Sequence, residues 1–384
     1  MRRSAKQPEV LVVQQLLKNF RVPLHDGVRQ TLATKGVDYR LVYSAAQGDE
    51  VTKGDCLNTE PGSGYQKIPL RHVGSFVWQH PPRWRHAAAI VVEQANKHLF
   101  NWYLLLNLWL LPRWCWPGRR KPQLIFWGHG YNHQRPYGFG EWVKKLQLKC
   151  PSAWLSYTSG VTHYLQQQGV APERITTLHN SLDNQHFGCQ VQLLRQQYKP
   201  DLPQTAKMRP LVLLFCGALY HDKQIPLLLQ VARQLVESHV VSSLIVVGDG
   251  PLRTLLTSSN EPWLDYRGAC FAEDKALAFA QADLVLNPGL VGLAILDAFA
   301  AGLPFITTDY PGHSPEISYL QSGVNGFMLP MDSIAITQAI SALQQNPAQL
   351  AKLAQGARDS AELYTMSSMV SNFSRGVLQS VHND

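Results

Sequence analysis

Short apolar runs alternate with longer stretches of mixed polarity along the 384 residues of the chain. Apolar runs of this kind are typical of strands that are buried on both faces of a sheet. The predicted strands are Val10–Val13, Tyr39–Tyr43, Phe76–Trp78, Leu124–Trp127, Trp154–Tyr157 and Ile175–Leu178 in the first half, and Leu211–Cys216, Leu244–Val247, Asp265–Gly268, Leu284–Asn287 and Phe305–Thr307 in the second.

Helical patterns separate these strands. They fall near residues 26–35, 84–98, 141–149, 160–168, 223–238, 251–257, 273–280, 292–301 and 332–344, and two further helices are expected between Asn346 and about Val381. Strands that alternate with helices indicate parallel sheets with helices on both faces. We therefore predict an α/β fold with two doubly wound, Rossmann-like domains that face a central cleft.

The stretch Tyr198–Pro210 is polar, carries three prolines and precedes a new strand, which is typical of a linker. We place one domain at residues 1–200 and the other at residues 210–364. In parallel α/β domains, ligands bind where the carboxyl ends of the strands meet, so we expect functional loops after the strands.

Composition excludes several classes of protein. A hydrophobic share of 45% with 16% charged residues excludes a disordered chain. The six cysteines form no Cys-x-x-Cys pair, which argues against a structural zinc and fits a reducing compartment. The polar N-terminus has no apolar stretch typical of a secretory signal, so we expect a cytoplasmic protein.

The net charge of +8 is unevenly distributed. Residues 1–190 hold 23 Lys and Arg against 11 Asp and Glu, an excess of 12, whereas residues 191–384 hold 12 against 16. This asymmetry predicts that the first half faces an anionic partner, either nucleic acid or an acidic membrane surface. No known nucleic-acid-binding motif is present, which disfavours the first.

One segment, Leu99–Trp116, is almost wholly apolar, and Arg119, Arg120 and Lys121 follow it. It is short for a bilayer span and is interrupted by Asn107 and Pro112. Tryptophans and basic residues beside an apolar helix suit a membrane interface. Two interpretations stay open: peripheral membrane insertion, or a buried helix followed by a basic loop.

Glycine-rich turns follow three strands of the second half. They carry Gly217 with Lys223, Gly248 with Gly250, and the run Gly289-Leu-Val-Gly-Leu293, which leads into a helix containing Asp297. Glycines let backbone amides approach a ligand, and helix N-termini attract anions. A strand–turn–helix junction alone explains each glycine turn equally well. Asp297 lies on a mostly apolar helix and needs a polar partner.

Taken together, the motifs Gly-x5-Lys, Gly-Asp-Gly-Pro, Ala-Asp-Leu-Val-Leu-Asn-Pro, Gly-Leu-x3-Asp-Ala-x-Ala-x-Gly-Leu-Pro, Pro-Glu-Ile and Gly-x-Asn-Gly resemble the family-4 retaining glycosyltransferases of the GT-B fold. They cover residues 211–330 with matching spacing. In the first half Phe20-Arg-Val-Pro-Leu24, Trp127-Gly-His129 and Asn180-Ser-Leu-Asp183 agree more loosely.

The resemblance implies transfer of a hexose, with retention, from a nucleoside-diphosphate sugar to a glycan or lipid-linked glycan in cell-surface polysaccharide or glycolipid synthesis. It assigns His129, Lys223 and Asp297 to catalysis and Arg21 to the acceptor side. It also implies that a last helix, about 365–384, crosses back to the first domain. The implied donor-binding residues are Gly217, Gly248, Gly250, Gly289, Leu290, Val291, Gly292, Leu293, Arg253 and Glu316.

No Asp-x-Asp occurs, so we expect neither a divalent metal nor another cofactor. The expected partners are a nucleotide sugar, the acceptor and an anionic membrane surface at the inner face of the cell membrane, without nucleic acid. Ala218 and Gly289 stand where the family has an Arg and a Glu. The alternative is therefore a catalytically impaired partner subunit. A Rossmann oxidoreductase is disfavoured because no Gly-x-Gly-x-x-Gly turn follows the first strand.

Overall fold

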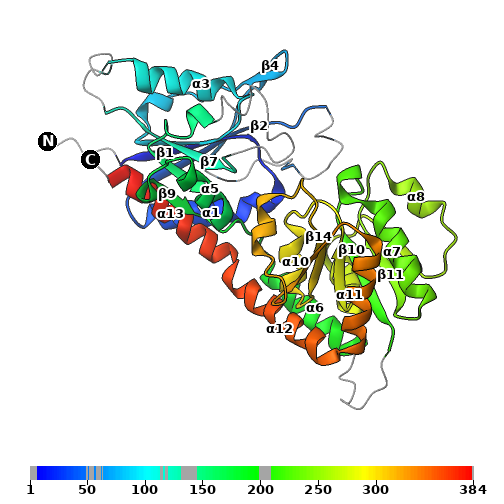
Figure 1. Cartoon of the computed structure of the whole chain (residues 1–384). Coiled ribbons are helices and arrows are strands. Elements are labelled where there is room, and N and C mark those ends of the chain that lie inside the picture. Colours follow the sequence, from blue (N-terminus) through cyan, green and yellow to red (C-terminus); the bar gives the residue numbers. More distant parts are fainter. Residues whose placement is uncertain are drawn as a thin grey trace. The chain divides into compact units, whose positions relative to one another are not determined.

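The computed structural model describes residues 7–48, 51, 56–57, 62, 64–112, 116, 120–130, 145–198 and 209–382. It divides into two compact units, Met1–Asn180 with Met366–Asp384, and Ser181–Thr365 (Figure 1). Each unit contains one parallel sheet with helices on both faces, which confirms the predicted α/β fold.

The first unit is built on a seven-stranded sheet in the order β3-β2-β1-β6-β7-β8-β9, and every pair in it is parallel. Its strands are β1 (Glu9–Leu16), β2 (Asp38–Ser44), β3 (Tyr65–Lys67), β6 (Ala89–Glu93), β7 (Gln123–Gly128), β8 (Ala153–Ser156) and β9 (Ile175–Thr177). The strand order reverses between β1 and β6, so the ligand-binding edge of this unit lies where these two strands end.

The helices of the first unit are α1 (Val22–Ala33), α3 (Leu99–Leu105), α5 (Ser159–Gln167) and α13 (Met366–His382), and short turns of helix occur at η1 (Asn19–Arg21), η2 (Trp84–His86), η3 (Leu106–Leu110) and η5 (Pro172–Arg174). The strands β4 (Arg71–Val73) and β5 (Phe76–Trp78) form a separate antiparallel hairpin. The C-terminal helix α13, red in Figure 1, packs on α1, β8 and β9.

The second unit has a six-stranded parallel sheet in the order β12-β11-β10-β13-β14-β15. This is the strand order of dinucleotide-binding Rossmann folds, with the switch point between β10 and β13. The strands are β10 (Leu211–Cys216), β11 (Val241–Val247), β12 (Leu264–Gly268), β13 (Leu284–Asn287), β14 (Phe305–Thr308) and β15 (Gly326–Leu329).

Helices cover both faces of this second sheet. They are α6 (Gln185–Tyr198), α7 (Ile225–Glu237), α8 (Arg253–Thr257), α9 (Ala272–Gln281), α10 (Ala294–Ala300), α11 (Ser333–Gln345) and α12 (Pro347–Leu363), together with the short turns η6 (His221–Lys223) and η7 (Pro315–Tyr319).

Alternate residues of the central strands enter different cores. In β1, Val10 and Val12 pack into one cluster, whereas Leu11 and Val13 pack into the cluster on the opposite face. In β10, Leu213 packs on one side of the sheet and Leu214 on the other. Strand side chains alternate between faces, so a continuous apolar run is needed where helices cover both.

The predicted helix at residues 84–98 is wrong. This stretch contains the central strand β6, and helix α3 begins only at Leu99. Ala89, Ile90, Val91 and Val92 are all fully buried or nearly so. A short, fully apolar run is compatible with a buried strand or a buried helix, so periodicity does not separate the two. Of the helix predicted at 141–149, residues 141–144 lie outside the described residues, and residues 145–147 are helical.

The boundary between the units also differs from the predicted one near residue 200. Residues from Ser181 onward belong to the second unit, because α6 packs against α9 and α10 there. The linker expected at Tyr198–Pro210 falls mostly on residues outside the described ranges. Met366–Asp384 groups with the first unit.

Much of the apolar segment Leu99–Trp116 is core. Phe100, Leu104 and Trp116 are buried in a cluster of the first unit, whereas Leu106 is 55% exposed. Lys121 donates through Nζ to the carbonyl oxygens of Leu108 and Leu111, at 3.0 and 2.5 Å. A basic group at these carbonyls stabilises a helix end. Within the described ranges, no helix is both long enough and apolar enough to cross a bilayer.

Candidate functional site: the switch-point loops of the second unit

Two loops at the switch point of the second sheet are tied together by backbone and side-chain hydrogen bonds. The loop after β10 contains Lys223, and the loop after β13 contains Leu290. The Leu290 amide donates to the Asp222 carbonyl oxygen at 2.7 Å, and Lys223 Nζ donates to the Leu290 carbonyl oxygen at 2.5 Å. The predicted cation is therefore fixed where ligands bind in this fold.

Burial changes the acid–base properties of this lysine. Desolvation lowers the pKa of Lys223 from 10.5 to about 8, because the half-buried ammonium loses water. Burial also raises the pKa of the neighbouring Cys216 thiol to about 12. The thiol therefore stays protonated and adds no negative charge beside Lys223. At neutral pH the site presents an ammonium group whose charge is only partly compensated.

The glycines of the three turns lie where backbone approaches backbone. A Cβ atom on Gly248 would stand 1.9 Å from the Gly217 carbonyl oxygen, and one on Gly250 would stand 2.8 Å from the Leu219 backbone. A Cβ on Gly289 would stand 2.1 Å from the Asp222 carbonyl oxygen. All three distances are shorter than real Cβ contacts, so these glycines allow the loops to pack together.

The turn after β13 uses two of the amides of residues Leu290–Leu293 internally. Leu290 donates to Asp222, and Val291 donates to His313 Nδ1 at 3.0 Å. Because His313 Nε2 also lies 2.7 Å from the Thr308 carbonyl oxygen, its ring is neutral with the proton on Nε2. Burial lowers the pKa of His313, which agrees with that form. Gly292 and Leu293 are the remaining amides of the turn.

Glu316 supports the same turn. Its carboxylate is buried and accepts from Ser314 Oγ at 2.6 Å, and that hydroxyl also contacts the Val291 carbonyl oxygen. The predicted donor-binding carboxylate is thus joined through Ser314 to the loop that follows β13.

Asp297 pairs with a lysine. Its Oδ2 lies 2.7 Å from Lys275 Nζ of α9, and only 7% of the residue is exposed. Burial by itself would lower the pKa of Lys275, but the charge of Asp297 and its hydrogen bond to the ammonium outweigh burial, so the pKa is raised. A sequence-only view missed Lys275, because its distance from Asp297 is set by the packing of α9.

Arg253, which the resemblance assigns to donor binding, and Arg267 of β12 both have acidic partners. Arg253 is exposed and lies 3.6 Å from Asp249. Arg267 contacts Asp265 at 2.6 Å and also donates to Gln281. Neither is paired with Lys223 or with the turn after β13 in the contacts described.

A further residue at this switch point was missed. Asn287 ends β13, is 1% exposed, and donates through Nδ2 to the Leu290 carbonyl oxygen at 3.2 Å. Among the described residues, its Oδ1 has no hydrogen-bond partner. A buried acceptor without a partner is uncommon, so Asn287 is an unusual polar residue at the switch point.

In the first unit, His129 and Arg21 lie at the carboxyl edge of the sheet. His129 follows β7, is exposed, and meets the Tyr157 ring edge-on with centroids 4.5 Å apart. Arg21 is buried, with its guanidinium 5.6 Å from the Trp127 ring and 5.8 Å from the Tyr157 ring. Because Arg21 is enclosed by rings, it stabilises this edge, and little of it reaches solvent.

A buried polar network beneath Arg21 was also missed. His25 contacts Tyr39 at 2.5 Å and Gln14 at 2.9 Å, and Gln14 donates to Glu93 at 3.3 Å. Burial lowers the pKa of His25 to about 3 and raises that of Glu93. Glu93 ends β6, the strand mistaken for a helix, so its place at the sheet edge was hidden.

Comparisons with known proteins agree with this architecture. Residues 210–346 match the family model described as Glycosyl transferases group 1, which covers less than half of the chain. The search of curated proteins found no match.

Solved structures match over almost the whole chain. HepE of Anabaena, in complex with UDP, has a TM-score of 0.64 at 15% identity and covers 97% of this chain and 100% of its own. A glycosyltransferase of Rickettsia africae has a TM-score of 0.65 at 13% identity, with 99% and 100% covered.

Sucrose-phosphate synthase of Thermosynechococcus elongatus is similar to the same extent. Its TM-score is 0.65 at 14% identity, with 97% of this chain and 98% of its own covered. At such low identity these likenesses establish the fold. Residues 210–346 are thus a group 1 glycosyltransferase domain, in a chain whose two Rossmann-like units have the GT-B fold.

Proposed function

We propose that the chain is a retaining glycosyltransferase that moves a hexose from a nucleoside-diphosphate sugar to a glycan or lipid-linked glycan. The observation that carries the proposal is the Lys223 ammonium, which the loops after β10 and β13 hold at the switch point of the second sheet. The solved HepE structures contain UDP and UDP-glucose, which supports a nucleotide sugar as donor.

In this proposal Lys223 binds the donor diphosphate. Negative charge grows on the leaving phosphate as the glycosidic bond breaks, and a prepositioned ammonium stabilises that charge. The amides of Gly292 and Leu293 contribute further donors, since those of Leu290 and Val291 are occupied. In same-face transfer the leaving phosphate oxygen accepts the acceptor's proton, so no separate protein base is needed.

Asp297 is proposed to bind the ribose hydroxyls. Its Oδ2 is held by Lys275, and this ion pair orients the carboxylate. His129 is proposed to orient the sugar, because its imidazole is exposed after β7. Arg21 is proposed to shape the acceptor side by holding the Trp127 and Tyr157 rings rather than by direct contact.

We further propose that transfer needs no metal or other cofactor. In the part of the chain that is described, no group of three or more His, Cys, Asp or Glu residues is arranged to hold a metal ion. The cationic side chain of Lys223 neutralises diphosphate charge in place of a divalent ion. Activity that survives EDTA supports this, and activity restored only by Mg²⁺ or Mn²⁺ contradicts it.

For the acceptor, we propose a glycan at an anionic membrane surface, in the synthesis of a cell-surface polysaccharide or glycolipid. Support comes from the positive charge of the first half, from the exposed Leu106, and from the basic Arg120 and Lys121, which follow its segment in the sequence. The burial of Phe100, Leu104 and Trp116 limits membrane contact to the outward side of this segment.

A catalytically impaired partner subunit is the second candidate. It is favoured by Gly289, whose close approach to Asp222 leaves no space for the carboxylate that the family has there. Titration with UDP-, GDP- and ADP-sugars, followed by transfer and hydrolysis assays on the purified chain, separates the candidates. Binding with turnover supports the enzyme, and binding without turnover supports the partner subunit. No binding of any nucleotide sugar contradicts the enzyme and leaves only a partner subunit that binds glycan.

A further inference from the structure

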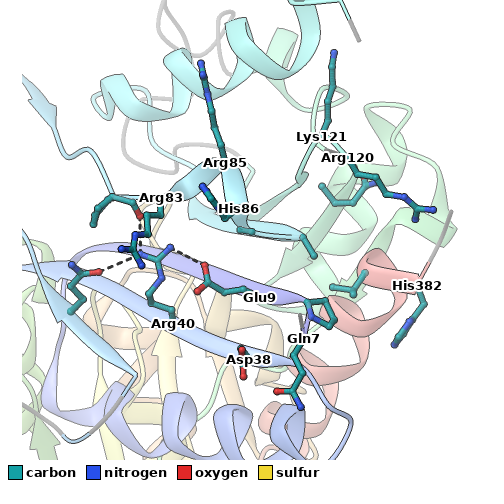
Figure 2. A pocket seen from close by; sticks show the side chains of 17 residues that line it. Gln7, Glu9, Asp38, Arg40, Arg83, Arg85, His86, Arg120, Lys121 and His382 are labelled. Carbon is teal, nitrogen blue, oxygen red and sulfur yellow. Dashed lines mark hydrogen bonds and ion pairs between the residues drawn. The ribbon is translucent and has the colours of Figure 1, made fainter. Parts of the chain in front are cut away.

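A pocket lies at the amino edge of the first sheet, opposite the edge that carries Arg21 and His129. It has a volume of about 840 Å³ and opens where β1, β2, β6 and β7 begin, next to Glu9, Asp38, Ala88 and Gln123. In a parallel sheet the strand beginnings and strand ends lie at opposite edges. This cavity, the amino-edge pocket, is therefore separate from the edge that carries Arg21 and His129 (Figure 2).

The amino-edge pocket is strongly basic. Its charged lining residues are Arg40, Arg83, Arg85, Arg120 and Lys121 against Glu9 and Asp38, and His86 and His382 also line it. In the view of Figure 2 the side chains of Arg85, His86, Arg120 and Lys121 lie above Glu9 and Asp38. The pocket thus gathers five basic residues of the first half, and two of them, Arg120 and Lys121, also belong to the proposed membrane-facing segment.

Three of these cations are fixed by the protein. Arg40 contacts Glu9 at 2.8 Å and donates to the Pro82 carbonyl oxygen at 2.9 Å. Arg85 lies over the Trp84 and Trp116 rings, at 5.2 and 5.4 Å from their centroids. Lys121 donates to two carbonyl oxygens, as described above. These contacts within the protein hold the three side chains, so the cations are in position before any ligand binds.

Arg83 and Arg120 have exposed side chains. Arg83 directly follows Pro82, whose carbonyl oxygen holds the Arg40 guanidinium, so the chain brings two arginines to one side of the pocket. Its φ of 56° is in the left-handed region, which is costly for a residue with a Cβ and is often found at ligand clamps. The turn thus holds Arg83 on the same side of the pocket as Arg40, although the positive φ of Arg83 is unfavourable.

We propose that the amino-edge pocket binds a ligand with two or more phosphate groups, held chiefly by Arg83 and Arg120. The planar guanidinium donates paired hydrogen bonds that match phosphate oxygens, and multiple cations favour a multiply charged anion. The volume exceeds what a single phosphate needs and is in the range of small-molecule sites. Among the described residues that line the pocket there is no Phe, Tyr or Trp, so the only rings that they offer a nucleobase are the imidazoles of His86 and His382.

Such phosphate groups come from two sources, a soluble polyphosphorylated molecule or a cluster of lipid headgroups. The test uses the full chain, with sodium tripolyphosphate as the soluble probe and phosphatidylcholine vesicles with or without phosphatidic acid as the lipid probe. Binding is measured at 0.15 M salt to limit nonspecific attraction. Because tripolyphosphate also suits the Lys223 site, hydrogen exchange separately follows peptides containing residues 82–89 and 120–123 and those containing residues 217–224.

The Arg83→Gln/Arg120→Gln variant removes both exposed guanidiniums, and Arg71→Gln removes an exposed arginine of β4 outside the pocket. We expect at least tenfold weaker binding of one or both probes in the double variant, less than a twofold change in Arg71→Gln, and lost protection at residues 82–89 and 120–123 only. Arg83→Gln alone, with an unchanged melting temperature, should show a smaller loss in the same direction.

If the double variant binds only tripolyphosphate more weakly, the ligand is a soluble molecule. If it binds only the vesicles more weakly, the ligand is a cluster of lipid headgroups. Weaker binding of both probes shows that the pocket binds phosphate groups from either source. Equal binding by wild type and double variant with both probes overturns the proposal. An equal loss in Arg71→Gln also overturns it, because the effect is then one of net charge. Protection confined to residues 217–224 overturns it too, since the probe then occupies only the other site.

Discussion

Lys275 Nζ lies 2.7 Å from Asp297 Oδ2, so a carboxylate on the apolar helix α10 is paired with a lysine of helix α9. The same lysine lies 4.9 Å from the Phe187 ring of α6. Through these two contacts Lys275 joins α9 to both α10 and α6 in the second unit. Asp297 has a structural role in addition to its proposed contact with ribose.

We predict two separable effects of Asp297→Asn. Loss of the charge partner of Lys275 should lower the free energy of unfolding by about 1–3 kcal/mol and the melting temperature by about 3–10 °C. Loss of the ribose contact should weaken donor nucleotide binding by at least tenfold, or about 1.4 kcal/mol. Thermal unfolding and calorimetric titration measure the two effects independently.

Lys275→Gln is the matched control for this prediction, because it breaks the same pair and leaves the carboxylate. It should destabilise to a similar degree with a smaller loss of nucleotide affinity. The 2′,3′-dideoxy nucleotide lacks the hydroxyls in question, so Asp297→Asn should affect it less than the intact nucleotide. If both nucleotides bind more weakly by the same factor, the ribose assignment fails and the pair is structural only.

Gly289 and Gly292 offer a second comparison within one turn. A Cβ on Gly289 meets the Asp222 carbonyl oxygen and Lys223 backbone, whereas one on Gly292 meets nothing within 4 Å. Gly289→Ala should therefore separate the two switch-point loops, cost about 1–3 kcal/mol of stability and weaken donor binding. Gly292→Ala should leave the melting temperature within about 2 °C. Equal effects of the two substitutions would show that the loops are not held as described.

The fold was largely predictable because strand side chains alternate between two covered faces. Continuous apolar runs such as Leu211–Cys216 identify buried parallel strands without any knowledge of their neighbours. The run at residues 89–93 gave no such certainty, since Ala, Ile and Val in so short a segment fit a buried helix equally well. The place of α6 depends on its contacts with α9 and α10, which no local pattern shows.

The candidate site was predictable only where a loop follows a strand. Gly217, Lys223 and Gly289 follow β10 and β13, so strand prediction alone brings them to one edge. The partners of these residues come from distant parts of the chain. Tertiary packing brings Lys275 to Asp297, His313 to the Val291 amide, and the Asp222 carbonyl oxygen to the Leu290 amide. The spacing of these residues along the sequence predicts none of the three contacts.

Burial of Lys223 predicts a distinctive pH dependence. Its folded-state pKa of about 8 is below the ordinary 10.5, so the ammonium loses its proton as the pH rises through 8. Donor affinity should therefore be greatest below pH 8 and fall above it. The contribution of Lys223 to the free energy of unfolding of the ligand-free protein should instead rise between pH 8 and 10.5. In that range the lysine is protonated in the unfolded chain and deprotonated in the folded one.

Titration of Lys223→Arg provides the control for that pH dependence. Arginine stays charged, so donor affinity in this variant should change little up to about pH 10. A wild-type affinity that is constant from pH 7 to pH 9.5 would exclude the Lys223 ammonium as the group that titrates.

Membrane association is tested by flotation with liposomes. Wild-type protein should float with vesicles containing acidic lipid, since each basic residue near such a surface contributes on the order of 1 kcal/mol. Leu106→Asp should reduce flotation, because Leu106 is exposed, whereas it should leave the buried core around Phe100 intact. Equal flotation with neutral and acidic lipid would remove the electrostatic part of the proposal, and no flotation would leave the segment as core alone.

The central claim is that Lys223 stabilises a departing nucleoside diphosphate during sugar transfer. The most direct measurement is the rate at which the protein releases nucleoside diphosphate from a donor identified by the nucleotide-sugar scan. It compares the wild type with Lys223→Ala and with Arg233→Ala, a control at an exposed site. We predict at least a tenfold loss for Lys223→Ala, or about 1.4 kcal/mol of barrier, and near wild-type turnover for Arg233→Ala. Near-normal turnover in Lys223→Ala, with the fold intact, would contradict the account.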